Sequence, residues 1–325
     1  MAKDIVFING IVKSREKSLI RYVDFIQMAD APSAREAFSM LKERGFGGEG
    51  FSDAEPNDYE KLIDSEWASY KKFLEEYSPS SNFSACVFAR DDFFNAEYAV
   101  RKVALGLDGD GFSTIGLFDS ELLLAAAGGK FDLLPDHLSR PMKEATKLFE
   151  DGEATGAKVS VIFLRAYYEY MLKAVKSAVW KESVIFEIDS KNIAAAIRSQ
   201  NWNSAVDQLI RGGRLNEKLL KTIFDGEERK ALDGVLRTPY YDLVKIGLDE
   251  KKAGGSLAEF ERAIENFAMK KLKEKRFETE GITPSLVFAN YKINELKNAR
   301  LVIALKLAGA DKEGIKRRLR ECYEG

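Results

Sequence analysis

The chain has 325 residues, of which 45% are hydrophobic and 31% charged, so wholesale disorder is excluded. Its 50 Lys and Arg residues nearly balance its 52 Asp and Glu residues, which argues against a nucleic-acid binder that relies on a broad basic surface. The longest apolar runs (122–129, 159–164 and 301–305) are far shorter than the ~18–20 residues that cross a bilayer, and no secretory signal follows Met1. We therefore expect a protein with no direct membrane span.

Helical signals follow one another along the first part of the chain. Residues 4–9 could form a strand, but their apolar spacing continues to Leu19 in steps that fit a helix better. Ser33 and Glu36 have the spacing of a capping box and predict a helix start. Residues 45–50 match the G-x-G-x-x-G pattern of dinucleotide sites. Because they follow a helical run rather than a strand, we interpret them as a helix-terminating loop.

The central and C-terminal parts also indicate helices. The longest predicted helix covers 157–180, where apolar residues recur at three- and four-residue steps. Thr238 and Thr283 each precede a proline, which is typical of an N-cap followed by the first helical residue. All seven prolines are expected at helix starts or in connections, and strands at the spacing of a sheet are not indicated. The sequence therefore predicts an all-α fold.

One helical signature recurs at intervals of roughly a hundred residues. Its residues are Asp92, Asn95 and Arg101 in the first copy, Asp189, Asn192 and Arg198 in the second, and Glu295 and Arg300 in a weaker third. The first two copies share both spacings, whereas the third is aligned with Glu295 in the Asn position and its Arg one residue early. The period predicts three similar helical repeats, with approximate boundaries at 1–110, 111–208 and 209–325.

The signature has two interpretations. Asp92 and Asp189 are expected at helix starts, where an acid interacts favourably with the helix dipole. Residues six apart differ by about 600° of helical rotation, so the Asn and Arg of each copy lie on different faces. The signature residues either pack and cap each unit or line a surface shared with a partner.

No catalytic, cofactor-binding or metal-binding residues emerge. The chain has one histidine, His137, with no recognisable nucleophile motif around it, which favours a helix-start or surface role. Cys86 and Cys322 are isolated and are expected to be reduced thiols. An unrecognised hydrolase that uses His137 is an alternative, and substitution of His137 would then abolish activity.

Two stretches concentrate positive charge, at 270–276 and 312–320. Such clusters are typical of a solvated helix face. The competing interpretation is a docking surface for an acidic partner, with Lys316, Arg317 and Arg318 as its candidate residues.

Several segments of this sequence together resemble the C subunit of the archaeal and bacterial V/A-type rotary ATPases, which corresponds to the d subunit of the eukaryotic vacuolar enzyme. The segments that carry the likeness lie in register over most of the chain, at 37–48, 90–101, 186–198, 209–215, 238–240 and 292–300. The third copy of the signature departs most from the pattern, which leaves open whether the three copies have equivalent roles.

The resemblance implies three similar helical repeats arranged as a funnel with approximate threefold pseudo-symmetry. It implies a non-catalytic, cofactor-free subunit of the central stalk, peripheral to the cytoplasmic face of the membrane. Its partners would be the membrane rotor ring of proteolipid subunits and the central axle subunits D and F, so that ATP synthesis or hydrolysis is linked to proton or sodium transport. A generic α-helical scaffold in a soluble complex is the alternative, and it would bind without the membrane ring.

Overall fold

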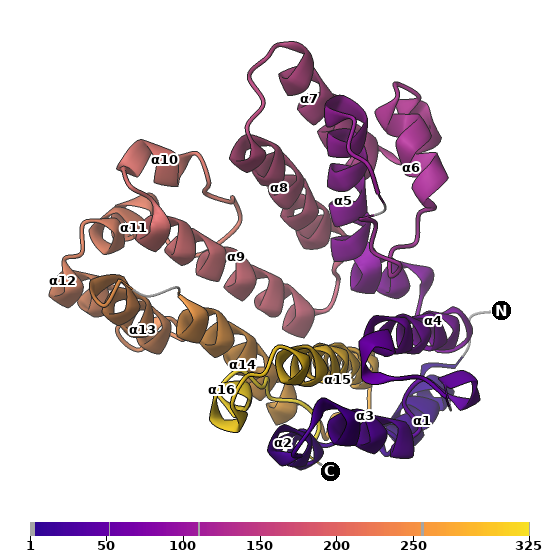
Figure 1. Cartoon of the computed structure of the whole chain (residues 1–325). Coiled ribbons are helices and arrows are strands. Elements are labelled where there is room, and N and C mark those ends of the chain that lie inside the picture. Colours follow the sequence, from indigo (N-terminus) through magenta and orange to yellow (C-terminus); the bar gives the residue numbers. More distant parts are fainter. Residues whose placement is uncertain (1–3, 52, 110, 255–256, 325) are drawn as a thin grey trace. The chain divides into compact units, whose positions relative to one another are not determined.

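The computed structural model describes residues 4–51, 53–109, 111–254 and 257–324, which form helices and loops with no strand among them (Figure 1). The all-α prediction is confirmed. The longer helices are α1 (Ile5–Glu16), α2 (Tyr22–Asp30), α3 (Ala34–Glu43), α4 (Tyr59–Tyr77), α5 (Ser81–Leu105), α6 (Ser120–Ala127), α7 (Asp136–Glu150), α8 (Gly156–Ala174), α9 (Ala178–Arg198), α11 (Glu217–Phe224), α13 (Tyr241–Lys252), α14 (Ala258–Glu274) and α15 (Thr283–Leu307). The shorter elements are η1 (Glu49–Phe51), η2 (Pro56–Asp58), η3 (Phe131–Leu133), α10 (Trp202–Val206), α12 (Glu228–Gly234) and α16 (Lys312–Lys316).

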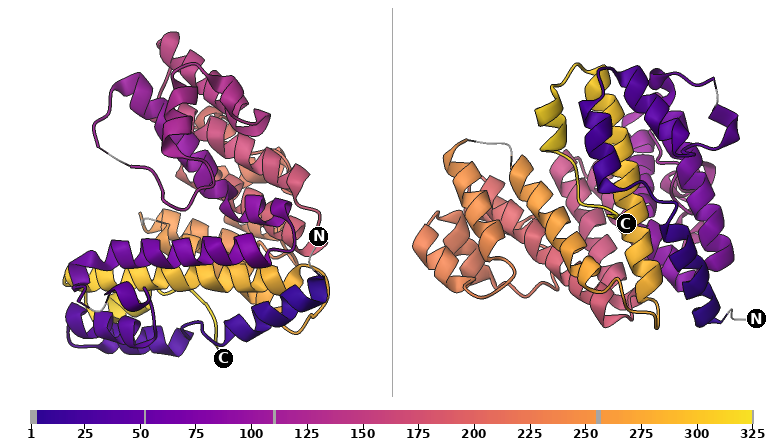
Figure 2. Two further views of the ribbon diagram at one scale, coloured as in Figure 1. Left: turned by 90° about the vertical axis from the view of Figure 1, so that its right-hand side faces the viewer. Right: turned by 90° about the horizontal axis from the view of Figure 1, so that it is seen from below.

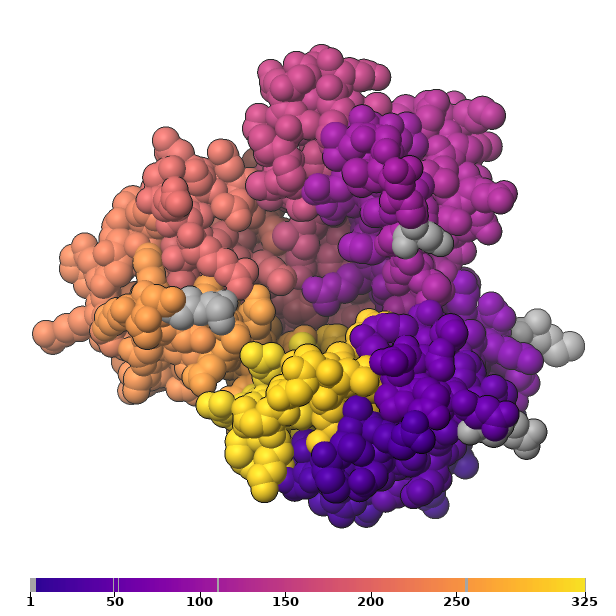
Figure 3. Space-filling view, in the orientation of Figure 1, coloured from indigo at the N-terminus to yellow at the C-terminus, as the bar shows by residue number. Residues whose placement is uncertain are grey.

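The chain divides into two compact units. Unit 1 combines Met1–Ser84 with Glu265–Gly325, and unit 2 is Ala85–Ile264. Unit 1 is therefore built from both ends of the chain, whose surfaces adjoin in a space-filling view (Figure 3). This division differs from the three consecutive ranges expected from the sequence, which stay a prediction.

Unit 1 is organised around α15, which contacts α1, α2, α3 and α4. Figure 2 shows α4 and α15 side by side along their lengths. The buried residues of α15 lie on all its sides, as expected of a helix that is enclosed by others. Phe25 of α2 and Phe38 of α3 are fully buried in this core.

Unit 2 has two described clusters of buried side chains. In one, Phe93 of α5 and Phe163 of α8 pack with apolar residues of α6 and α7. In the other, Tyr168 and Met171 of α8 pack against Ile188 of α9. Helix α8 contributes to both clusters and so joins α5 to α9.

Two predictions about the middle of the chain are wrong. The helix predicted over 157–180 is interrupted, because α8 ends at Ala174 and α9 begins at Ala178, with the Ser177 hydroxyl accepting the Trp180 N–H. The apolar periodicity continues across the break and therefore hides it. Pro141 lies inside α7 rather than at a start or in a connection, although it is only the sixth residue of that helix.

Other local predictions hold. Residues 5–16 form helix α1, and the Ser33 hydroxyl accepts the Glu36 N–H at the start of α3. The glycines of 45–50 follow α3 as a loop, with Gly45 and Gly47 at positive φ. The two predicted threonine N-caps are wrong: Thr283 is the first residue of α15, and Thr238 lies before α13, whose N-cap is Tyr240.

Candidate functional site

The first copy of the signature fastens the middle of α5 to the loop that precedes α6. The Asn95 side chain donates from Nδ2 to the Ser113 carbonyl at 2.9 Å and accepts the Ser113 N–H at 2.7 Å. Asp92 Oδ1 accepts the Leu117 N–H at 2.6 Å and the Phe118 N–H at 3.3 Å. We call this arrangement, an acid and an Asn that bind the backbone of a distant loop, a polar clasp.

The second copy builds the same clasp on α9. Asn192 donates to the Ile210 carbonyl at 2.9 Å and accepts the Ile210 N–H at 2.8 Å. Asp189 accepts the N–H groups of Arg214 and Leu215 before α11. Each Asn binds a residue 18 positions later, and each acid binds residues 25 and 26 positions later, in both copies.

The sequence suggested that the two acids lie at the starts of their helices, but the structure places them elsewhere. Asp92 and Asp189 are buried in the middle of α5 and α9. Each carboxylate instead holds backbone N–H groups just before a later helix of its unit, α6 for Asp92 and α11 for Asp189. A buried carboxylate needs hydrogen-bond donors, and the backbone N–H groups of the loop supply them to Asp92 and Asp189.

The third clasp corrects the alignment of the third copy. Asn298 of α15 donates to the Arg320 carbonyl at 2.8 Å and accepts the Arg320 N–H at 2.9 Å, so Asn298 takes the Asn position. Glu295 takes the position of the acid, and its Oε1 accepts the Ile20 N–H at 2.6 Å just before α2. The alignment was misled by Arg300, which lies two residues after this Asn rather than six.

Each of the three signature arginines binds residues near the N-terminal end of another long helix. Arg101 donates to the Gly156 carbonyl and the Ser160 hydroxyl in α8. Arg198 pairs with Glu261 of α14 at 2.6 Å, and Arg300 pairs with Glu60 of α4 at 2.8 Å. Arg300 follows the Asn of its clasp by two residues, whereas Arg101 and Arg198 follow theirs by six. The difference of four residues is about one helical turn, so Arg300 lies on a similar face of its helix.

Two glycines make the first two clasps possible. A Cβ on Gly213 would lie 2.2 Å from Asp189 Oδ1, and a Cβ on Gly116 would lie 2.8 Å from Asn95 Nδ2. Reasoning from the sequence missed these two residues. Their signal was present, because both glycines follow the clasp acid by 24 residues.

The third clasp continues into a buried group of charges in unit 1. Lys292 Nζ lies 2.6 Å from Glu66 Oε2 and 2.6 Å from Glu295 Oε2, and Glu66 also accepts the Gly47 N–H at 2.8 Å. Burial raises the pKa of Glu295, although Lys292 acts against it. Burial also disfavours the ammonium of Lys292, but the two carboxylates outweigh it and raise its pKa. The loop of 45–50 is thereby tied to α4 and α15.

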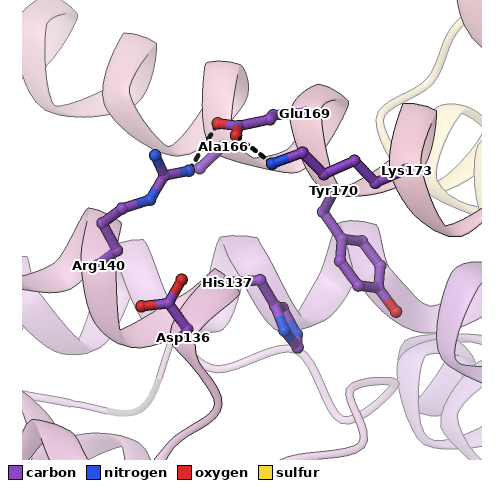
Figure 4. A pocket seen from close by; sticks show the side chains of 7 residues that line it. All are labelled: Asp136, His137, Arg140, Ala166, Glu169, Tyr170 and Lys173. Carbon is purple, nitrogen blue, oxygen red and sulfur yellow. Dashed lines mark hydrogen bonds and ion pairs between the residues drawn. The ribbon is translucent and has the colours of Figure 1, made fainter.

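His137 lines a cavity of about 350 Å³ between α7 and α8 (Figure 4). Its ring stacks on Tyr170 with centroids 4.4 Å apart, and burial lowers its pKa. Glu169 bridges Arg140 at 2.6 Å and Lys173 at 2.7 Å, and these hydrogen bonds lower the pKa of Glu169 to about 2. No Ser, Thr or Cys belongs to this described lining, so the cavity offers His137 no aliphatic hydroxyl or thiol nucleophile.

The basic clusters are partly neutralised within the chain. Lys316 lies 2.7 Å from Asp30 and 3.3 Å from Glu313, whereas Arg317 and Arg318 are exposed. In the other cluster Lys273 is nearly buried and pairs with Glu324. The described residues contain no group of three His, Cys, Asp or Glu side chains placed to hold a metal ion.

Comparison with known proteins identifies the family. The family model described as ATP synthase (C/AC39) subunit matches residues 8–318, which include all three clasp helices. The chain is 22% identical over 329 residues to the C subunit of the V-type sodium ATPase of Enterococcus hirae, with 98% of each chain covered. Among the described residues, no helix has the length and apolarity that a membrane span requires. The chain therefore belongs to the ATP synthase (C/AC39) subunit family.

Proposed function

We propose that the protein is a non-catalytic central-rotor subunit of a V/A-type rotary ATPase. It couples the membrane rotor ring of proteolipid subunits to the central axle subunits D and F, and so links ATP synthesis or hydrolysis to proton or sodium transport. The observation that carries the proposal is the family match over 8–318, together with a relative, covered to 98% of its length, that is named as the C subunit of a V-type sodium ATPase.

The clasps support a mechanical role. A part that passes torque must resist deformation within each unit, and buried, fully paired polar groups give a loop one well-defined position. Asn192 and Asn298 are both almost fully buried and use the amide donor and acceptor at once. In this proposal three similar helical repeats form a funnel with approximate threefold pseudo-symmetry, and the first two clasps each tie a helix of one predicted range to the loop that opens the next.

The proposal also specifies what the subunit lacks and where it acts. It lies peripherally on the cytoplasmic face of the membrane, binds no nucleic acid and uses no cofactor. The nucleotide chemistry belongs to other subunits of the complex. Partner contacts through the half-exposed Arg198 and Arg300 of the signature are part of the proposal, in addition to their bonds within the chain.

The exposed arginines next to Lys316 are the proposed basic docking residues. Reversal of Arg317 and Arg318 to Glu should leave the helical spectrum unchanged and weaken assembly, because the two side chains project from the surface. Lys316→Glu is the comparison, since it also breaks the ion pair with Asp30 and should lower stability. Unchanged assembly of the double reversal would contradict a docking role for this cluster.

The proposed function is tested by a pull-down of the purified chain against two partners used separately, the detergent-solubilised rotor ring and the isolated axle subunits. Binding to both is expected of a coupler. Binding to neither, with a folded helical spectrum, would reject the proposal and favour the α-helical scaffold. Binding to the axle alone would reject the link to the membrane ring.

A further inference from the structure

The cavity between α7 and α8 of unit 2 has no part in the proposed rotor function. Its volume of about 350 Å³ falls within the range of about 300–1,000 Å³ that is typical of pockets for small organic ligands. A second cavity of about 90 Å³ adjoins it, because both are lined by Arg140, Ala166 and Glu169. The second cavity adds the apolar side chains of Pro141 and Ile162. The hollow therefore suits a small organic molecule with an apolar part rather than a single ion.

Two cations on one side of the larger cavity have hydrogen-bond donors to spare. Arg140 donates from Nη2 to Glu169 at 2.6 Å, and Lys173 donates from Nζ to the same carboxylate at 2.7 Å. A guanidinium has five N–H groups and an ammonium has three, so one shared carboxylate leaves most of them without a partner among the described residues. The Arg140 and Lys173 side chains are 53% and 75% exposed, so a ligand can reach them from solution. This side therefore suits a carboxylate.

The opposite side of the cavity supplies a free carboxylate and an aromatic wall (Figure 4). Asp136 is the first residue of α7, and its side chain makes no hydrogen bond or ion pair to a residue that the structure describes. The His137 ring lies 4.4 Å from the Tyr170 ring and 6.0 Å from the Phe93 ring, which hold it in place. This side therefore suits an ammonium group next to an apolar surface.

The charges that line the larger cavity cancel. Two carboxylates, those of Asp136 and Glu169, balance the two cations. Burial lowers the pKa of His137, so its ring is neutral at pH 7 and adds no charge. An anion would add unbalanced negative charge beside Asp136, and an amine would add unbalanced positive charge beside the two cations. A zwitterion presents a carboxylate to the cations and an ammonium to the free acid, and adds no net charge.

We propose that this cavity binds a free α-amino acid with an apolar side chain. The carboxylate of the ligand accepts hydrogen bonds from Arg140 and Lys173, and its ammonium donates to Asp136. Its apolar side chain packs against Ala166 and the ring of His137. Such a ligand joins α7 to α8 through groups of both helices. The site goes beyond the proposed rotor function, which requires no small molecule.

Binding of leucine to the untagged full-length chain tests the proposal. His137 is the one histidine of the chain, so imidazole NMR signals report on the cavity directly. Leucine should shift these signals and bind as one molecule per chain in isothermal titration calorimetry. Two analogues test its charged groups, since isocaproate lacks the ammonium and isoamylamine lacks the carboxylate. Each analogue should bind at least about tenfold more weakly than leucine, because charge-assisted hydrogen bonds are lost.

Two variants with matched controls locate the bound leucine. Asp136→Asn should weaken leucine binding at least about tenfold without weakening isocaproate, since the ammonium alone uses Asp136. Lys173→Met should weaken both leucine and isocaproate. The controls Asp132→Asn and Lys147→Met change exposed residues outside the lining, and they should bind leucine as the wild type does. All four positions are exposed, so the helical spectrum should stay unchanged in each variant.

Several results would overturn the proposal. His137 signals that do not move at millimolar leucine would reject binding in this cavity. Isocaproate, isoamylamine or inorganic phosphate bound as tightly as leucine would show that the cavity selects a single charge rather than a zwitterion. Equal leucine binding by the wild type and Asp136→Asn would remove the ammonium contact on which the assignment depends. These measurements use the chain alone, so none of their outcomes bears on the proposed rotor function.

Discussion

The second clasp offers a sharp test of how unit 2 is held together. In Asn192→Ala the Ile210 N–H and carbonyl both lose their partner, and Ile210 and Asn192 are buried to 5% and 3% exposure. Two net hydrogen bonds contribute about 2 kcal/mol, and a buried donor and acceptor left without partners add to the cost. We expect the free energy of unfolding to fall by about 3 kcal/mol.

The first clasp provides the internal comparison. Asn95 makes the same pair of bonds to Ser113, but Ser113 is only half-buried, so water can replace the lost amide. We expect Asn95→Ala to cost about 1 kcal/mol. Both sites belong to unit 2, and so the two losses can be compared within one structural unit.

Urea unfolding followed by tryptophan fluorescence measures these losses. Of the three tryptophans in the chain, Trp180 and Trp202 belong to unit 2, so a Trp67→Phe background makes the signal specific to that unit. At about 2–3 kcal/mol per M urea, the midpoint of Asn192→Ala should fall by about 1 M. Asn203→Ala, on the exposed side of α10, should change it little.

Equal midpoints for Asn192→Ala and Asn95→Ala would refute this reasoning, because burial of the partner backbone would then not decide the cost. A midpoint for Asn192→Ala within about 0.3 M of the wild type would refute it too, since the clasp would then contribute nothing measurable to the stability of unit 2.

Three further predictions concern charge and packing. Burial acts against the Asp24 carboxylate, but Arg21 and Arg44 outweigh it and lower the pKa of Asp24. Asp24→Asn should therefore lower the free energy of unfolding by about 2 kcal/mol at pH 7. Urea titrations should show that the difference in stability between the wild type and Asp24→Asn shrinks as pH falls below 4. A loss that does not change between pH 7 and pH 3 would contradict this. Lys292→Met leaves two buried carboxylates facing each other and should cost about 3–5 kcal/mol in thermal or urea unfolding, against under about 1 kcal/mol for Lys271→Met in an exposed pair. Gly213→Ala should cost about 1–3 kcal/mol in the same assay, because its Cβ meets Asp189, whereas the same change at Gly128 meets only contacts of 3.5 Å.

Local signals in the sequence were read more accurately than long-range ones. The capping box at Ser33 involves atoms three residues apart, so its geometry follows from spacing alone. The roles of Asp92 and Asp189 could not be read in this way, because their partners are backbone groups 25 residues away in a loop of unknown path. Spacing showed that these residues matter together, but it did not show which atoms they bind.

The third clasp was misaligned for a related reason. Its Asn binds a residue 22 positions later instead of 18, and the partner of its acid lies at the other end of the chain. An alignment along the sequence has no access to Ile20 when it considers Glu295. The alignment therefore followed Arg300, which lies on a similar helix face but one turn closer to the Asn.

Closure by a distant chain end also accounts for the chemistry of the third clasp. The acids of unit 2 close loops of 25 residues, whereas Glu295 and Ile20 are 275 residues apart. For a flexible chain this difference costs about 2 kcal/mol of additional closure entropy. Glu reaches one methylene further than Asp, and Lys292 adds charge-assisted contacts to Glu66 and Glu295 at 2.6 Å. The departure of the third copy from the Asp-x-x-Asn pattern thus follows from its position in the unit that joins the two ends of the chain.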